Sequence, residues 1–209
     1  NIDYQEALAA INRSIGVRVG GPLGRQLLRE AVAVSRKLAL ANPEQPKFWK
    51  HAVGASMELA AFENSEQNFE EALRESQQAL QYYAAYRDDV IAAQLCSLID
   101  ILQQKIRALE GLRDPTAVQV MEECARVCEQ VEGWDTKYQY YRQVRGGLYL
   151  KIAQSSQQSG NVGASRRQLQ QAIDTLQGYQ PTLAIYESEL AGIRGEIEQL
   201  QALLQASDE

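Results

Sequence analysis

The sequence predicts an all-α protein, and three observations lead to that prediction. Apolar residues recur with helical periodicity along nearly the whole 209-residue chain. Neither a sustained two-residue alternation nor an Asn-Gly or Asp-Gly hairpin turn marks a strand. Prolines, glycines and polar turns divide the chain into helix-length segments. We therefore expect antiparallel helices joined by short turns.

Each expected helix has a recognisable start or stop. Pro22, Pro46, Pro115 and Pro181 fit the first turns of helices. Asp88 or Asp89 and Asp135 or Thr136 are candidate N-caps, and SGN precedes another helix. The expected helices cover about 2–13, 22–41, 46–62, 69–87, 89–109, 115–131, 136–158, 162–177 and 181–205. The segment SIGVRVGG is expected to be a loop after the first helix.

A small residue, followed by a small or apolar one, recurs at corresponding places in four of these helices. Each pair is seven residues apart, which places both members on one helix face; the pairs are Ala31 with Leu38, Ala72 with Ala79, Ala117 with Cys124, and Ser165 with Ala172. The first members are 41, 45 and 48 residues apart. Small residues allow close helix approach, so the spacing predicts a stacked two-helix repeat.

This pattern resembles the tetratricopeptide repeat. One window reads Tyr149, Ile152-Ala153, Ser156, Gly160, Val162, Ser165, Leu169, Ala172, and a second reads Leu59-Ala60, Phe69, Ala72, Ser76, Ala79. The resemblance implies a right-handed superhelix of about four helix pairs in a single domain, 1–209. The expected repeats are 2–41, 46–87, 88–131 and 136–178. A final helix, 181–206, would cap the last open apolar face.

The segment SSQQSGNVGASRRQLQQAI contains glycines, a serine and two arginines near a helix start. A phosphate-binding Walker loop requires a preceding strand and a Gly-Lys-Ser/Thr ending, and this segment has neither. We interpret it as an inter-helix turn with Gly160 as its turn glycine. The glycine-rich GVRVGGPLGR also lacks these features and is expected to be a connection.

Candidate catalytic and metal sites are sparse. His51 is the only histidine, and its place beside Phe48 and Trp49 favours a packing or surface role. Cys124 and Cys128 share a helix face, but a structural zinc site needs four ligands, so buried packing thiols are favoured. We expect no catalysis, no cofactor and no metal. Three cysteines and no apolar stretch of about 20 residues favour a cytoplasmic protein.

Charge is unevenly distributed in this chain of net charge −6. Residues 136–173 contain no Asp or Glu, and their cations include Arg142, Arg145, Lys151, Arg166 and Arg167. The two arginines of the SRR sequence are expected in the first turn of a helix, where the macrodipole disfavours cations. A partner-binding surface explains the window, and a merely solvated face remains the alternative. Gln154 is expected near the concave face of the repeat.

Tyrosines form two clusters that suggest contact surfaces. The first contains Tyr82, Tyr83 and Tyr86, and the second contains Tyr138, Tyr140 and Tyr141. Tyrosine and arginine are enriched in protein interfaces, which favours partner binding by the second cluster. Packing between repeats is the alternative for both.

The long repeats, with the phrase EAVAVSRKLALANPEQ, also resemble the kinesin-light-chain group, of which a bacterial member accompanies bacterial tubulins. The resemblance implies an adaptor that stabilises or cross-links a tubulin-like polymer with an acidic surface. A peptide-binding regulatory module of a signalling or secretion system is the second possibility. The acidic net charge argues against nucleic acid, no membrane partner is expected, and self-association stays open.

Overall fold

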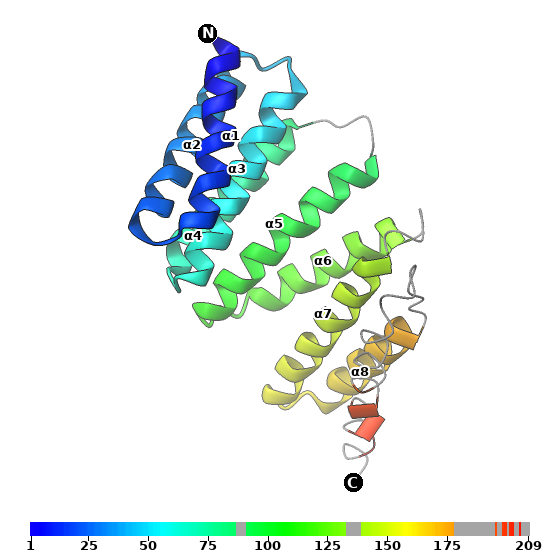
Figure 1. The fold of residues 1–209 in the computed structure, drawn as a ribbon. Helices are drawn as coiled ribbons and strands as arrows, with labels where there is room; N and C mark the ends of the chain where they lie inside the picture. Colours follow the sequence, from blue (N-terminus) through cyan, green and yellow to red (C-terminus); the bar gives the residue numbers. More distant parts are fainter. Residues whose placement is uncertain are drawn as a thin grey trace. The chain divides into compact units, whose positions relative to one another are not determined.

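A computed structural model describes residues 1–86, 91–132 and 139–177, together with residues 195, 198–199, 201–202 and 205. Over these residues the protein is helical, without strands, and the predicted all-α class is confirmed (Figure 1). Eight helices are described: α1 (Ile2–Val19), α2 (Gly21–Ala41), α3 (Pro46–Ser65), α4 (Phe69–Ala85), α5 (Ile91–Gly111), α6 (Ala117–Glu132), α7 (Gln139–Gln158) and α8 (Val162–Gln177). None of them is both long and apolar enough to cross a membrane.

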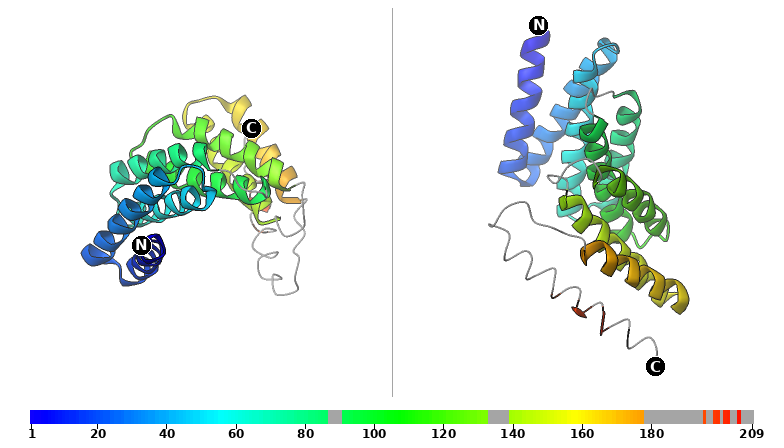
Figure 2. Two further views of the ribbon diagram at one scale, coloured as in Figure 1. Left: turned by 90° about the horizontal axis from the view of Figure 1, so that it is seen from above. Right: turned by 90° about the vertical axis from the view of Figure 1, so that its right-hand side faces the viewer.

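The chain forms two compact units, Asn1–Ala117 and Val118–Glu209. In the first unit, each helix from α1 to α5 packs against the next one in sequence (Figures 1 and 2). In the second unit, α7 and α8 form a closely packed hairpin. The predicted grouping of all repeats into one superhelical domain stays a prediction. The expected cap, 181–206, lies almost entirely outside the described residues.

The helix contacts are built on the small residues that the sequence marked. All four pairs, from Ala31 and Leu38 to Ser165 and Ala172, are buried. In the first unit, Ala79 joins Phe48, Leu38 and Ile101 in a core drawn from α2, α3, α4 and α5. In the second unit, the residues Ala153, Leu169, Ala172, Ile173 and Leu176 form the α7–α8 core.

The first helix differs from its prediction. It continues to Val19, through the segment expected to be a loop, and turns at Gly20 and Gly21, both of which have positive φ. Gly16 and Gly24 face each other across the α1–α2 contact. A Cβ atom on Gly24 would lie 2.6 Å from the carbonyl oxygen of Gly16. Because these two glycines have no side chains, the backbones of α1 and α2 can approach each other closely.

Three helices end in the same type of turn, which we call a corner. Gln67, Arg113 and Gly160 have φ values of 60°, 55° and 76°, and the next residue donates its N–H to a carbonyl five positions back. These N–H···O distances are 2.8, 2.9 and 2.9 Å, the pattern of a Schellman corner. The corners stand 46 and 47 residues apart along the chain. The interpretation of SGNVGASRR as a turn is confirmed, because Gly160 is the third corner.

Candidate protein-interaction surface

The α7–α8 hairpin carries most of the residues expected to bind a partner. Its two helices contain five cations and a single acid, Asp174, which accepts a hydrogen bond from Gln170 at 2.8 Å. The structure separates these cations into an internal group and an exposed group. Tyr138 lies outside the described residues.

Arg142 and Arg145 form the internal group, because α6 supplies the acids that their own window lacks. Arg145 pairs with Glu132 at 2.9 Å and with Glu129 at 3.1 Å, and Arg142 pairs with Glu132 at 3.3 Å. The Arg145 side chain is only 13% exposed. Residues 136–173 thus contain no acid themselves, but acids of α6 lie beside two of their arginines. Arg145 holds α7 against α6 and presents little surface to a partner.

Glu132 is the centre of this internal cluster. Burial raises the pKa of its carboxyl, while the charge of Arg145 and the hydrogen bond and charge of Arg142 oppose that rise. Oε1 of Glu132 and Nε of Arg145 are buried and have no hydrogen-bond partner. Nearby, burial raises the pKa of Tyr149. The cluster is therefore a structural link with incomplete hydrogen bonding.

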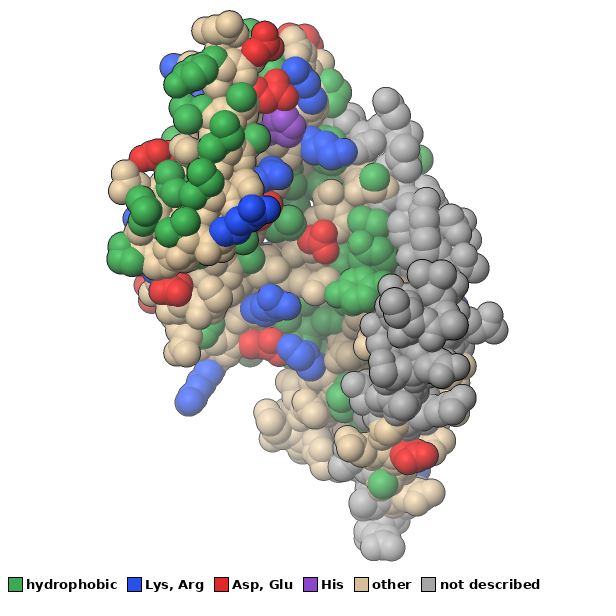
Figure 3. All heavy atoms as spheres, viewed as in Figure 1, with side chains coloured by type: hydrophobic (Ala, Val, Ile, Leu, Met, Phe, Trp, Pro, Cys, Tyr) green, Lys and Arg blue, Asp and Glu red, His purple; other side chains and the backbone are tan. Residues whose placement is uncertain are grey.

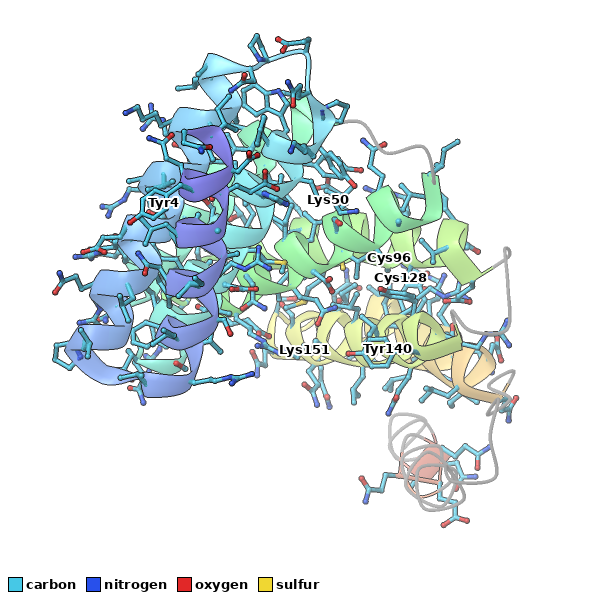
Figure 4. All side chains as sticks on the ribbon, turned by 45° about the horizontal axis from the view of Figure 1, so that its top comes forward. Tyr4, Lys50, Cys96, Cys128, Tyr140 and Lys151 are labelled. Atoms are coloured by element: carbon cyan, nitrogen blue, oxygen red, sulfur yellow. The ribbon has the colours of Figure 1, made fainter. Side chains whose placement is uncertain are left out.

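The exposed group consists of residues on both α7 and α8. Tyr140 and Lys151 are exposed, and their eleven-residue separation is about three helical turns (Figure 4). Gln154 and Arg166 are also exposed; Gln154 follows Ala153 of the α7–α8 core, and Arg166 follows the buried Ser165. Tyr140, Lys151, Gln154, Arg166 and Arg167 are thus each exposed on α7 or α8.

The α8 arginines do not occupy the expected first turn. The helix begins at Val162, with Asn161 Oδ1 accepting the N–H of Ala164 at 3.1 Å, so Arg166 and Arg167 belong to the second turn. The macrodipole effect falls off within the first turn. The prediction that these arginines oppose their own helix is wrong, and their exposure remains the argument for a binding role.

The tyrosine clusters differ in their environments. Tyr82 and Tyr86 are 5% and 1% exposed, and Tyr82 packs against Trp49 with ring centroids 6.2 Å apart. The first cluster therefore serves packing. In the second, Tyr140 is 56% exposed and meets the half-buried Tyr141 edge-on at 5.5 Å.

The expected packing roles of His51 and the cysteines agree with their surroundings. His51 Nδ1 lies 3.6 Å from Glu6, and burial lowers the pKa of this imidazole. Cys124 and Cys128 are buried. The hydrogen bond with Cys124, reinforced by burial, raises the pKa of the Cys128 thiol. Across the described part of the chain, no three His, Cys, Asp or Glu side chains gather in a group that could hold a metal.

Sequence reasoning missed a charged groove of about 620 Å³ beside the α3–α4 corner. Its walls include Arg25, Arg29 and Arg74, and Glu63 lies at its base, 1% exposed. Arg25 Nε donates to both carboxylate oxygens of Glu63 at 2.9 and 3.2 Å, and Asn68 Nδ2 donates at 2.8 Å. The only feature of the sequence that pointed to this groove is the run of acids from Glu63 to Glu75. The arginines of this groove therefore form ion pairs with Glu63 and Glu71.

Comparison with known proteins gives no family. No family model matches the chain, and no curated protein matches it. Among solved structures, a de novo designed helical repeat protein matches 99% of this chain and 96% of its own, with 12% identity and a TM-score of 0.29.

Proposed function

We propose that the protein is a non-catalytic adaptor that binds an acidic protein surface through the exposed group of α7 and α8. The observation that carries the proposal is the exposure of Lys151, Arg166 and Arg167 on two helices that together contain a single acid. The all-α helical-hairpin fold is compatible with a protein-interaction role. Tyr140 and Gln154 add an aromatic body and an amide to the exposed group.

The proposed contact is electrostatic in its first stage. Cations at the rim of an interface accelerate encounter with an acidic partner, and salt screens this attraction over about 10 Å at 0.1 M. Tyr140 then supplies apolar contact area with a polar tip. In this arrangement, Arg142 and Arg145 contribute by fixing α7 through Glu132.

The resemblance to tetratricopeptide and kinesin-light-chain repeats suggests the partner class. We propose a cytoplasmic bacterial tubulin-like polymer, which the adaptor would stabilise or cross-link. The second candidate is an acidic peptide, bound by the same exposed group in a regulatory module. Exposed cations on a hairpin fit both, so the test separates them.

Cosedimentation with a purified bacterial tubulin-like filament is the direct test. The protein is expected to pellet with polymer but not with unpolymerised subunits, and pelleting should fall as salt rises. Combined Arg166→Glu and Arg167→Glu substitutions should weaken binding at least tenfold. The matched control is Arg36→Glu with Lys37→Glu, an exposed basic pair on α2 that changes net charge equally. A folded Arg166/Arg167 variant that binds like wild type overturns the proposed surface.

A titration with acidic peptides separates the second candidate. Saturable one-to-one binding that is lost in the Arg166/Arg167 variant, without pelleting on polymer, assigns the exposed group to a peptide. Equal loss of binding in the Arg36/Lys37 control would instead indicate a non-specific effect of net charge.

A further inference from the structure

The outward face of α1 is apolar although it is exposed. Tyr4, Ile11 and Ile15 are 68%, 53% and 43% exposed, and they share one stripe because their spacings are seven and four. Leu23, at the start of α2, is 54% exposed and extends the apolar surface. Figure 3 shows hydrophobic side chains gathered on this side of the first unit, and Figure 4 labels Tyr4 on α1.

The charged residues of α1 point the opposite way. Glu6 accepts from Lys47 of α3 at 3.0 Å, and Arg13 pairs with Glu58 of α3 at 3.1 Å. The remaining charged residues, Asp3 and Arg18, stand at the two ends of the helix, where both are exposed. An amphipathic surface helix normally turns its charged face to solvent. In α1 the arrangement is reversed, which indicates that another surface covers the apolar stripe.

We propose that the occupant is a second copy of this chain, with the two α1 helices packed antiparallel around Ile11. The stripe is self-complementary, because Tyr4 and Arg18 each lie seven residues from Ile11. In the antiparallel pair, Ile11 meets Ile11 of the partner subunit. The bulky Ile15 is then level with Ala7 of the partner subunit.

The end charges of α1 support this arrangement. Tyr4 is level with Arg18 of the partner subunit, and Asp3 lies one residue from the same level and on the same side. The acid in the first turn of each helix would thus meet the base in the last turn of the other. Two-fold symmetry repeats this contact, giving an isologous interface with two ion pairs and two tyrosine–arginine contacts. A parallel pair would instead place like charges together.

The size of the surface sets the expected affinity. An 18-residue helix is about 27 Å long, so one helix pair buries an area at the low end for specific interfaces. We expect a reversible dimer whose population depends on protein concentration. This dimer does not involve α7 or α8 and stands apart from the proposed partner binding.

Sedimentation velocity over a concentration series tests the dimer. Wild type should shift from monomer to dimer, whereas Ile11→Asp should raise the dissociation constant at least tenfold. Leu40→Asp is the matched control, since Leu40 is 59% exposed on α2 and outside the stripe. Unchanged circular dichroism would show that Ile11→Asp remains folded. A monomer at every concentration, or a dimer equally stable with Ile11→Asp, overturns the proposal.

Introduced cysteines test the orientation. Ile11→Cys should form a disulfide-linked dimer on mild oxidation, since a disulfide requires Cα atoms within about 7 Å. Tyr4→Cys should not, because antiparallel packing separates its two copies by about 14 residues, or about 21 Å. Efficient cross-linking by both variants would indicate a parallel pair, and cross-linking by neither would show that something other than a second copy covers α1. These measurements need no acidic partner, so they fail or succeed independently of the proposed function.

Discussion

The α3–α4 and α7–α8 hairpins turn through the same corner but use charge differently. In both, an asparagine N–H, from Asn68 or Asn161, closes the corner onto a carbonyl five residues back. Around the first corner, arginines bind the buried Glu63, and Glu63 is replaced by Ser156 at the equivalent position of the second. The second hairpin instead exposes cations at the surface. The backbone thus fixes the corner, and the side chains are left to provide either stability or a binding surface.

Replacing the buried carboxylate should have the largest effect on this comparison. Glu63→Ala leaves Arg25, Arg29 and Asn68 without their shared acceptor, and breaking a buried pair typically costs about 3–5 kcal/mol. Because both arginines are partly exposed, we expect about 3 kcal/mol in urea unfolding. Ser156→Ala, at the equivalent position, should cost clearly less. Equal losses for the two variants would contradict the contrast between the corners.

Overpacking the helix contact is expected to be the next largest effect. Ala72 is fully buried, so Ala72→Leu should lower the free energy of unfolding by roughly 1–3 kcal/mol. Ala33→Leu adds the same atoms at an exposed position of α2 and is the control. Thermal denaturation measures both. A melting temperature unchanged by Ala72→Leu would show that the small-residue register does not set the packing.

Substitutions at the two corner positions should change stability differently. Gly160→Ala places a Cβ in the left-handed region without any steric neighbour, and this should cost about 1 kcal/mol. Gln67→Gly relieves the same backbone conformation in the first hairpin and should be neutral or slightly stabilising. Chemical denaturation of both variants measures the difference. Destabilisation by Gln67→Gly as large as that by Gly160→Ala would mean that side-chain contacts, and not φ, dominate the corner.

The smallest effect concerns the ion cluster behind the second hairpin. Burial raises the folded-state pKa of Glu132 above its ordinary value of 4.5, so the folded state holds this proton more tightly than the unfolded chain. The resulting stabilisation is present below pH 4.5 and is lost as pH rises through the folded pKa. Wild type should therefore gain stability relative to Glu132→Gln on acidification from pH 7. A difference between the two proteins that does not change with pH would contradict this assignment.

Local physics made much of the fold predictable. Seven-residue spacing of small side chains requires only helical geometry and close packing, and Ala31, Ala72 and Ser165 are buried as expected. The corner at Gly160 could likewise be predicted, because a glycine there favours a turn. In contrast, the sequence predicts a loop at Gly16, which lies within α1, because sequence alone does not distinguish a glycine needed for helix contact from one needed for a turn.

The candidate site was predictable only in part. Lys151, Arg166 and Arg167 of the acid-free window are exposed, but Arg145 forms ion pairs with the acids of α6, 13 and 16 residues earlier. Such pairing depends on how helices are placed, and charge counts within a window cannot reveal it. The Arg25–Glu63 pair spans 38 residues and was missed for the same reason.

The glycine contact between α1 and α2 has a consequence for the kinetics of assembly. With Gly16 and Gly24 in backbone contact, sliding α1 so that Asn12 takes the place of Gly16 would bring a side chain into a space that has no room for a Cβ. The helix is thereby pre-organised, and docking on its outer face loses little conformational entropy. Mutations at this crossing should consequently change how often encounters succeed, even though neither glycine would touch the docked surface.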